Sequence, residues 1–190
     1  MKEPLHLQYS DKDLIIRDES NYSLSPMDNA RTYAVEYFLS GERVATNQVS
    51  VTVLDHDGTS HSCILSASGG GSTVHDRSAL ICENTLYVAV GSQLCALTLP
   101  TLSLLWNRKV DSATCFGVLY SAKHNCLISH GELEIARVEL DGNVTWCQSG
   151  RDIFTGELSL EPEQIKVTDW NNDLYVLAIS DGHFLVAPTP

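Results

Sequence analysis

The sequence lacks clustered positive charge, long apolar runs and an export signal. Its 190 residues hold 12 Lys and Arg against 24 Asp and Glu, a formal net charge of −12, and no stretch forms a basic run. Because phosphate recognition needs clustered basic side chains, we expect no nucleic-acid partner. No apolar run reaches the roughly eighteen residues of a membrane span. The charged start at residues 1–6 lacks the apolar core of an export signal, so we expect a cytoplasmic protein without membrane contact.

The six cysteines lack the spacing of a metal knuckle or a redox pair, because no Cys-x-x-Cys occurs. In a cytoplasmic protein such cysteines are reduced and serve as small, buried apolar residues. They stand at Cys63, Cys82, Cys95, Cys115, Cys126 and Cys147. The sequence also lacks a nucleophile elbow and a His-Glu-x-x-His pair. We therefore expect no cofactor, and no motif indicates an enzyme.

The acidic residues are concentrated at the two ends of the chain. Residues 1–58 hold ten acidic and five basic side chains, residues 59–150 seven and five, and residues 151–190 seven and two. One interpretation is a solvated surface that keeps the protein soluble. The other is an acidic docking face for a basic partner, whose binding would weaken with salt.

A repeat of about forty residues runs through the second half of the sequence. Three apolar strand centres recur at intervals of 40 and 39 residues, namely Val88, Ile128 and Val167. Trp106 and Trp146 are 40 residues apart, and so are the Asp-Gly pairs at 141–142 and 181–182. This periodicity predicts one structural unit repeated three times.

Each unit has the pattern of an antiparallel meander. A short apolar strand is followed by a turn, an alternating strand such as Glu134–Glu139, a hairpin turn such as Asp141-Gly142, and a third strand. Apolar segments at 79–82 and 116–120 supply a further strand before the first two units. Four strands in about forty residues are typical of a propeller blade.

These units resemble the repeats of PQQ-like and WD-like β-propellers. Leu86–Trp106 matches the Leu-Tyr-Val, Leu-x-Ala-Leu and Trp landmarks of that repeat most closely. The segment from Ser129 to Phe154 is also similar to uncharacterised bacterial propeller-like proteins. The resemblance covers residues 77–187 and implies a propeller-like fold, which hosts enzymes, scaffolds and binding proteins alike. It does not extend to a quinone cofactor, since no residue here matches the quinone-binding set.

The front third departs from the repeat and predicts a meander of longer strands. Strands are expected at 32–39 and 43–54 around the turn Ser40–Glu42, and at 60–66 after the turn Asp55–Gly58. A helix competes for residues 26–38, where apolar residues keep a helical spacing. A smaller hairpin is expected at 5–9 and 14–17, and the glycine run 69–71 is interpreted as a flexible connection.

The predicted fold is all-β. It is either a small propeller-like architecture of about four to five blades of antiparallel meanders, or a front sheet packed on three blade repeats. We divide the chain into a strand-rich segment, residues 1–68, and three blade-like repeats, residues 77–190, within one compact domain. A monomer and a homodimer that completes the ring are both compatible with this count.

Polar residues near the repeat turns are the candidates for a site. In a blade the turns open on one rim, so His130, Glu132 and Asp169 are expected to face one mouth, with His75 nearby. Such a set could act as acid and base or bind a cation, although turn residues that simply face water show the same pattern. We assign no metal ligands from the sequence.

Two further features suggest contacts. Arg151 and Asp152 form either a lock between blades or a site for an anionic group. Trp106 and Trp146 recur with the repeat and are assigned to packing, whereas Trp170 lies in a turn beside Asp169 and is the kind of aromatic anchor that binding sites use.

The sequence favours a non-catalytic binding module that recognises a protein partner, with a basic partner as one expectation. An inhibitor or immunity protein for a basic toxin is one role that suits a small acidic propeller-like protein. The alternative is a small hydrolase or lyase that uses His130, Glu132, His75 and Asp169, with or without a metal. It requires these four side chains to converge in one pocket.

Overall fold

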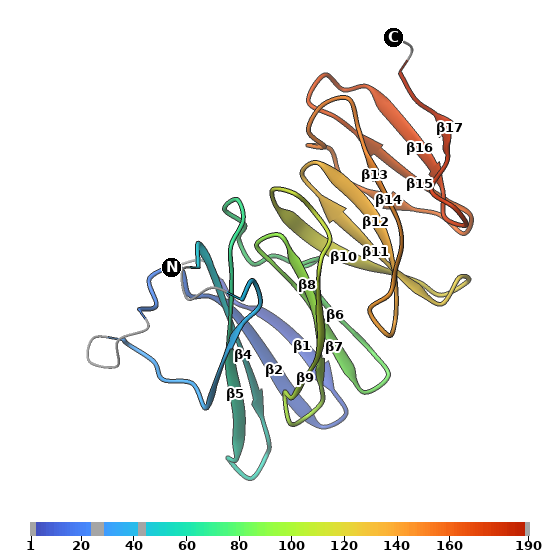
Figure 1. The fold of residues 1–190 in the computed structure, drawn as a ribbon. Helices are drawn as coiled ribbons and strands as arrows, with labels where there is room; N and C mark the ends of the chain where they lie inside the picture. The colour runs from blue at the N-terminus through green and yellow to red at the C-terminus, as the bar shows by residue number, and fades with distance from the viewer. Residues whose placement is uncertain (1–2, 24–28, 42–44, 189–190) are drawn as a thin grey trace.

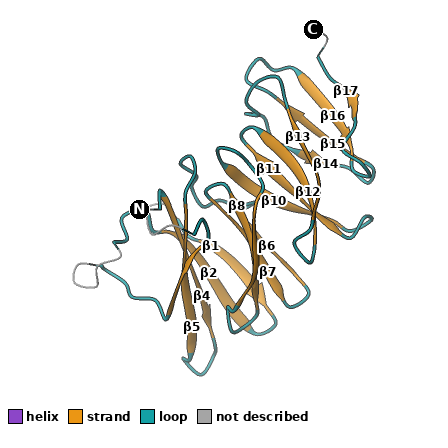
Figure 2. Cartoon of the chain, viewed as in Figure 1, coloured by secondary structure: helices purple, strands orange, loops and turns teal. Residues whose placement is uncertain are grey.

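The chain forms a row of four β-sheets. The computed structural model describes residues 3–23, 29–41 and 45–188, and these form seventeen strands and no helix (Figures 1 and 2). Within these residues no helix could cross a membrane. The expected all-β fold with blade-like sheets is therefore confirmed.

The three repeats form three four-stranded antiparallel sheets. Sheet 2 consists of β6 (Ala79–Cys82), β7 (Thr85–Val90), β8 (Gln93–Thr98) and β9 (Leu104–Lys109). Sheet 3 consists of β10 (Cys115–Ser121), β11 (Cys126–Gly131), β12 (Glu134–Glu139) and β13 (Val144–Ser149). Sheet 4 consists of β14 (Ser159–Leu160), β15 (Gln164–Thr168), β16 (Leu174–Ala178) and β17 (Phe184–Val186). In each sheet the strands follow their order in the chain, as a meander requires.

The front third forms sheet 1, in the order β1-β2-β4-β5-β3. Its strands are β1 (Leu5–Tyr9), β2 (Lys12–Asp18), β3 (Val35–Phe38), β4 (Asn47–Leu54) and β5 (Ser60–Ala67). The strand interpretation holds at residues 35–38. The competing helix is wrong for the described residues 29–38, and residues 24–28 lie outside the described part of the chain.

The expected hairpin between β3 and β4 is also wrong. β4 already pairs with β2 on one edge and with β5 on the other, so it has no free edge for β3. β3 instead joins the outer edge of β5 in parallel, with Val35 opposite Cys63. The turn residues 42–44 lie outside the described part of the chain.

Apolar side chains fill the space between neighbouring sheets. Sheets 2 and 3 are covered on both faces, which explains why β7, β8 and β11 read as nearly continuous apolar runs. The repeat register inferred from Val88 and Ile128 is off by one residue. Val88 packs toward sheet 1, whereas Ile128 packs toward sheet 4, and residues on opposite faces of a strand cannot be equivalent.

An aromatic side chain near the outer edge of each of the first three sheets reaches the next sheet. Its donor bonds a carbonyl in the turn between the third and fourth strands of that sheet. The three bonds are Tyr37 Oη to Leu102 O at 3.1 Å, Trp106 Nε1 to Leu140 O at 3.0 Å and Trp146 Nε1 to Ile179 O at 2.9 Å. We call this contact the aromatic latch. The assignment of both tryptophans to packing is confirmed.

The two Asp-Gly turns of the repeat are shaped for the latch. Gly142 and Gly182 have φ angles of 88° and 74°, which disfavour residues with a side chain. A Cβ at these glycines would lie 2.7 Å from the ring of Trp106 and 2.6 Å from that of Trp146. The 40-residue spacing of tryptophans and glycines therefore records contacts between consecutive sheets.

The first two glycines of the run between sheet 1 and sheet 2 are tightly packed, so the expected flexible connection is wrong at Gly69 and Gly70. A Cβ at Gly69 would lie 2.6 Å from the backbone nitrogen of Ser92. Gly70 donates its backbone N–H to Ala113 O, and its carbonyl accepts a bond from Asn47 Nδ2. Glycine is required here because three sheets approach one another at this backbone.

The latch predicts a measurable loss of stability in Trp146→Phe. The substitution removes the indole N–H and leaves the Ile179 carbonyl without its donor in a buried site, so we expect the free energy of unfolding to fall by about 1–3 kcal/mol. Urea unfolding followed by circular dichroism measures it. The matched control is Trp170→Phe, an exposed site where we expect a change within about 0.5 kcal/mol. Equal stability of both variants would contradict the latch.

Candidate functional site

One rim of the array is formed by the turns between the second and third strands of sheets 2 to 4. Each turn is bonded to the connection that leads into its own sheet. The bonds are Ser92 N to Ser68 O at 3.1 Å, Glu132 N to Thr114 O at 2.8 Å and Trp170 N to Ile153 O at 2.9 Å. We call this surface the upper rim, since it lies uppermost in Figure 1. Its turns are therefore held by backbone bonds.

Asp169 organises the turn of sheet 4 from the inside. Its side chain is only 1% exposed and accepts bonds from Asn171 N at 2.9 Å, Asp173 N at 3.0 Å and Tyr175 Oη at 2.9 Å. The structure thus places Asp169 beneath the rim, whereas sequence reasoning expected it on the surface. Its neighbour Trp170 points outward and is 67% exposed.

A second buried carboxylate, which sequence reasoning missed, organises sheet 3. Asp111 lies in the connection from sheet 2 and accepts four backbone N–H groups, at 2.6 to 2.9 Å. The donors are Ala113, Thr114, Leu133 and Glu134. Burial raises the pKa of Asp111, and the four bonds oppose that shift. The Asp-Ser pair after a strand is a turn signal that could have revealed it.

Sequence reasoning expected His130 at the rim turn. It lies instead in strand β11, below that turn. Its Nε2 atom is buried and has no hydrogen-bond partner among the described residues. The ring packs edge-on against Phe116, with centroids 5.7 Å apart. Burial, together with the charges of Arg77 and His75, lowers the pKa of His130 to about 4. The imidazole is therefore neutral at pH 7 and serves as a packed aromatic ring.

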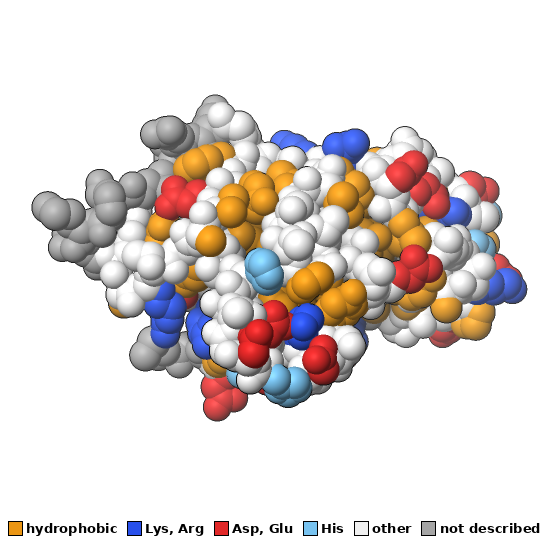
Figure 3. All heavy atoms as spheres, turned by 90° about the horizontal axis from the view of Figure 1, so that it is seen from below, with side chains coloured by type: hydrophobic (Ala, Val, Ile, Leu, Met, Phe, Trp, Pro, Cys, Tyr) orange, Lys and Arg blue, Asp and Glu red, His pale blue; other side chains and the backbone are white. Residues whose placement is uncertain are grey.

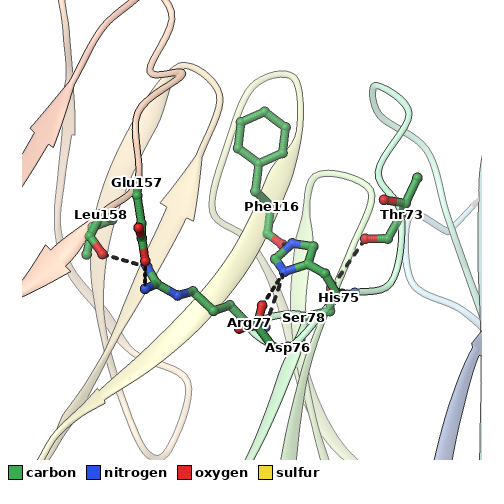
Figure 4. A network of polar contacts seen from close by, with 8 residues as sticks. All are labelled: Thr73, His75, Asp76, Arg77, Ser78, Phe116, Glu157 and Leu158. Carbon is green, nitrogen blue, oxygen red and sulfur yellow. Dashed lines mark hydrogen bonds and ion pairs between the residues drawn. The ribbon is translucent and has the colours of Figure 1, made fainter. Parts of the chain in front are cut away.

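His75 and Arg77 connect the sheets at their inner edge (Figure 4). His75 Nε2 donates to the Phe116 carbonyl at 2.9 Å, and His75 Nδ1 accepts the Arg77 backbone N–H at 3.2 Å. The Arg77 guanidinium extends past sheet 3, bonds Leu158 O at 2.6 Å and forms an ion pair with Glu157. Both side chains thereby join the start of sheet 2 to sheets 3 and 4.

The four residues of the enzyme alternative do not form one pocket. Asp169 is saturated within its turn, and His75 is bonded to the Phe116 backbone. The Glu132 carboxylate lies beside Gly70. Among the described residues, no group of three or more His, Cys, Asp and Glu side chains could hold a metal ion. The convergence that the enzyme alternative requires is absent from this part of the chain.

A shallow pocket of about 320 Å³ opens on the upper rim, between the β11–β12 turn of sheet 3 and the connection that leads to sheet 4. Its lining includes Glu134, Arg151, Asp152 and Ile153. Asp152 Oδ2 accepts a bond from Asn171 Nδ2 at 3.1 Å, which ties the pocket wall to the Trp170 turn. Because Trp170 N bonds Ile153 O, the exposed indole belongs to the turn that borders this pocket. The structure therefore brings Arg151, Asp152 and Trp170 into one neighbourhood.

The pocket combines charged, polar and apolar groups of the kind that bind protein side chains. Glu134 accepts a bond from Ser112 Oγ at 2.9 Å, and the Arg151 backbone N–H bonds Tyr175 Oη at 3.1 Å. Carboxylates, a guanidinium and the apolar side chains of Leu133 and Ile153 are thus carried by turns and connections whose backbone is bonded. The opposite, lower face of the molecule, seen in Figure 3, also carries interspersed acidic, basic and apolar side chains. At the rim pocket the mixture of charged and apolar groups is a composition found in protein interfaces.

The cysteines are mainly core residues. Cys63, Cys95, Cys115 and Cys126 are buried, and burial raises the pKa of each thiol. Cys147 is exposed and Cys82 is half-buried, so the expectation of six buried cysteines is wrong for these two residues. Partial burial of the Sγ atom and the nearby Glu134 raise the pKa of the Cys147 thiol to about 12.

The lowered pKa of His130 predicts a pH-dependent loss of stability. The unfolded chain binds this proton near pH 6.5 and the folded chain only near pH 4, so stability falls as the pH falls from 6.5 to 4. The full shift corresponds to at most about 3 kcal/mol. We expect His130→Gln to lose this part of the pH dependence in urea unfolding at pH 7 and pH 4.5. An unchanged difference between the two pH values would contradict the assignment.

Comparison with known proteins supports the fold. No family model and no curated protein matches the sequence. BamB from Moraxella catarrhalis superposes with a TM-score of 0.65 and 13% identity, over 97% of this chain and 50% of that one. U3-55K superposes with a TM-score of 0.50 and 13% identity, over 62% and 41%. The computationally designed Ika4 protein gives 0.50 and 11%, over 62% and 76%. The chain thus spans about half the length of BamB and has a propeller-like repeat fold.

Proposed function

We propose that this chain is a non-catalytic module that binds a protein partner through the upper rim of sheets 3 and 4. The observation that carries the proposal is Trp170, which is 67% exposed on a turn whose backbone is bonded to Asp169 and Ile153. A large aromatic ring exposed to water on a rigid support is typical of an interface anchor.

Rigidity of the turn supports the proposal. The Asp169 carboxylate and the Tyr175 hydroxyl hold the turn in one conformation before any partner arrives. A partner would therefore lose little free energy in ordering this surface. Proteins with propeller and WD-type folds commonly serve as interaction modules, which agrees with this use of the rim.

The charges around the pocket indicate a basic partner. Glu134 and Asp152 line the pocket together with one basic residue, Arg151, and Asp173 lies in the neighbouring Trp170 turn. The surplus of negative charge would steer a basic surface toward the pocket. A cytoplasmic inhibitor or immunity protein that neutralises a basic target is the role that best combines these features.

The proposal predicts that Trp170→Ala weakens partner binding at least tenfold, because truncation of an anchor costs more than about 1.4 kcal/mol. The partner is captured on the immobilised chain, identified by mass spectrometry, purified and titrated by calorimetry. Leu105→Ala, an exposed apolar side chain on β9, is the matched control and should bind as the wild type does.

Salt provides an independent check of the partner's charge. We expect the affinity to fall at least tenfold between about 50 mM and about 500 mM salt if acidic residues steer a basic partner. Asp152→Asn should reduce this salt dependence. Binding that is insensitive to salt would refute the basic partner, and binding that survives Trp170→Ala would refute the rim as the site.

A further inference from the structure

Two pockets at the first strands of sheets 3 and 4 are lined by charges that are already paired. One, of about 410 Å³, is lined by Arg77 and Glu157, which form an ion pair. The other, of about 330 Å³, is lined by Lys123 and Glu161, each of which pairs with a neighbour of opposite charge. Neither pocket therefore needs a charged ligand to balance its lining.

The pocket on the upper rim, which we call the rim pocket, differs in this respect. Within the described residues, neither of its two carboxylates forms an ion pair with a basic side chain. Asp152 accepts the Ile153 backbone N–H at 2.8 Å and Asn171 Nδ2 at 3.1 Å, and both donors are neutral. Glu134 Oε2 accepts Ser112 Oγ at 2.9 Å. Because a carboxylate has about four acceptor sites, each has room for further donors from a ligand.

The lining of the rim pocket fits a long cationic side chain. Leu133 and Ile153 supply apolar surface for a methylene stem, and Glu134 and Asp152 supply negative charge. Arg151 is the one basic residue of the described lining, so the carboxylates exceed it by one charge. One incoming cation therefore makes the lining neutral, and a pocket of about 320 Å³ has space for a single long side chain.

The placement of the two carboxylates favours arginine over lysine. Glu134 begins β12, whereas Asp152 belongs to the connection toward sheet 4, so a ligand has to reach acceptors on two segments. A guanidinium carries five N–H donors in a planar fork and can bond both, whereas an ammonium is a compact point charge. A guanidinium is also more weakly hydrated, which lowers the cost of placing it beside Arg151.

We propose that the rim pocket is a subsite for an arginine side chain of the protein partner. Its guanidinium lies between Glu134 and Asp152, and its stem lies against Leu133 and Ile153. This subsite rests on the proposed function, since it names the group that the partner inserts. Trp170 lies on the adjoining turn, so its ring packs on the partner surface beside the inserted arginine and helps to exclude water.

Nuclear magnetic resonance of the ¹⁵N-labelled full chain tests the subsite, with N-acetyl-L-arginine amide as the probe. We expect a dissociation constant of roughly millimolar order and shifts of the backbone amide signals of Glu134 and Ile153. N-acetyl-L-citrulline amide, in which a neutral urea group replaces the guanidinium, should bind at least fivefold more weakly. N-acetyl-L-lysine amide should also bind more weakly than the arginine probe. Equal affinity for the arginine probe and either of the others, or no shift of these signals at about 50 mM probe, would overturn the subsite.

Glu134→Gln should weaken binding of the arginine probe at least fivefold, because it removes the charge and nearly keeps the shape of the side chain. Glu83→Gln removes one negative charge from an exposed turn of sheet 2, and this matched control should bind the probe as the wild type does. Circular dichroism and urea unfolding establish that both variants are folded. A folded Glu134→Gln protein that binds the probe normally contradicts the subsite.

The arginine subsite and the proposed rim function fail in different ways. Trp170→Ala should weaken binding of the partner and leave binding of the arginine probe unchanged. If the partner binds Glu134→Gln normally and Trp170→Ala weakly, the arginine subsite is wrong and the rim remains the binding surface. If the probe binds as expected and the partner binds Trp170→Ala normally, the pocket binds arginine and the rim anchor is wrong.

Discussion

Contact between the two apolar faces of consecutive sheets is the constraint on which the structure depends. A four-stranded meander buries little by itself, and each sheet becomes stable only when a neighbour covers it. The aromatic latch sets how the neighbours meet, since Tyr37, Trp106 and Trp146 each bond the next sheet in the row. The glycines under the tryptophans and the packed Gly69 and Gly70 are consequences of that close approach.

The upper rim derives its order from buried carboxylates. Asp111 and Asp169 each collect several donors of a turn, and this offsets the cost of placing a charge away from water. Because the buried carboxylates fix the backbone of each turn, the neighbouring surface side chains leave the turn in a fixed direction. Trp170 is exposed because Asp169 is buried beneath it, so the candidate binding surface is a product of the fold's own hydrogen bonding.

The accuracy of the sequence predictions follows the range of the interactions involved. Strand positions, the forty-residue unit and the role of the repeated tryptophans were predicted well, because alternation and turn residues act within a few positions. The alignment of Val88 with Ile128 was wrong by one residue, because the turn between the third and fourth strands is one residue shorter in sheet 3 than in sheet 2. The proposed His130, Glu132, His75 and Asp169 set failed because spacing does not reveal whether a side chain points into a core or out of it.

The sequence by itself determined an all-β chain with a repeated blade-like meander, an acidic surface and an aromatic residue in the turn of the last repeat. Only the tertiary structure decided that β3 pairs with β5, that Asp169 lies inside its turn, and that the outer face of sheet 1 is covered by the chain's own segments. The physical reason is that local pattern selects strands and turns, whereas edges and faces are assigned by competition among segments far apart in the chain.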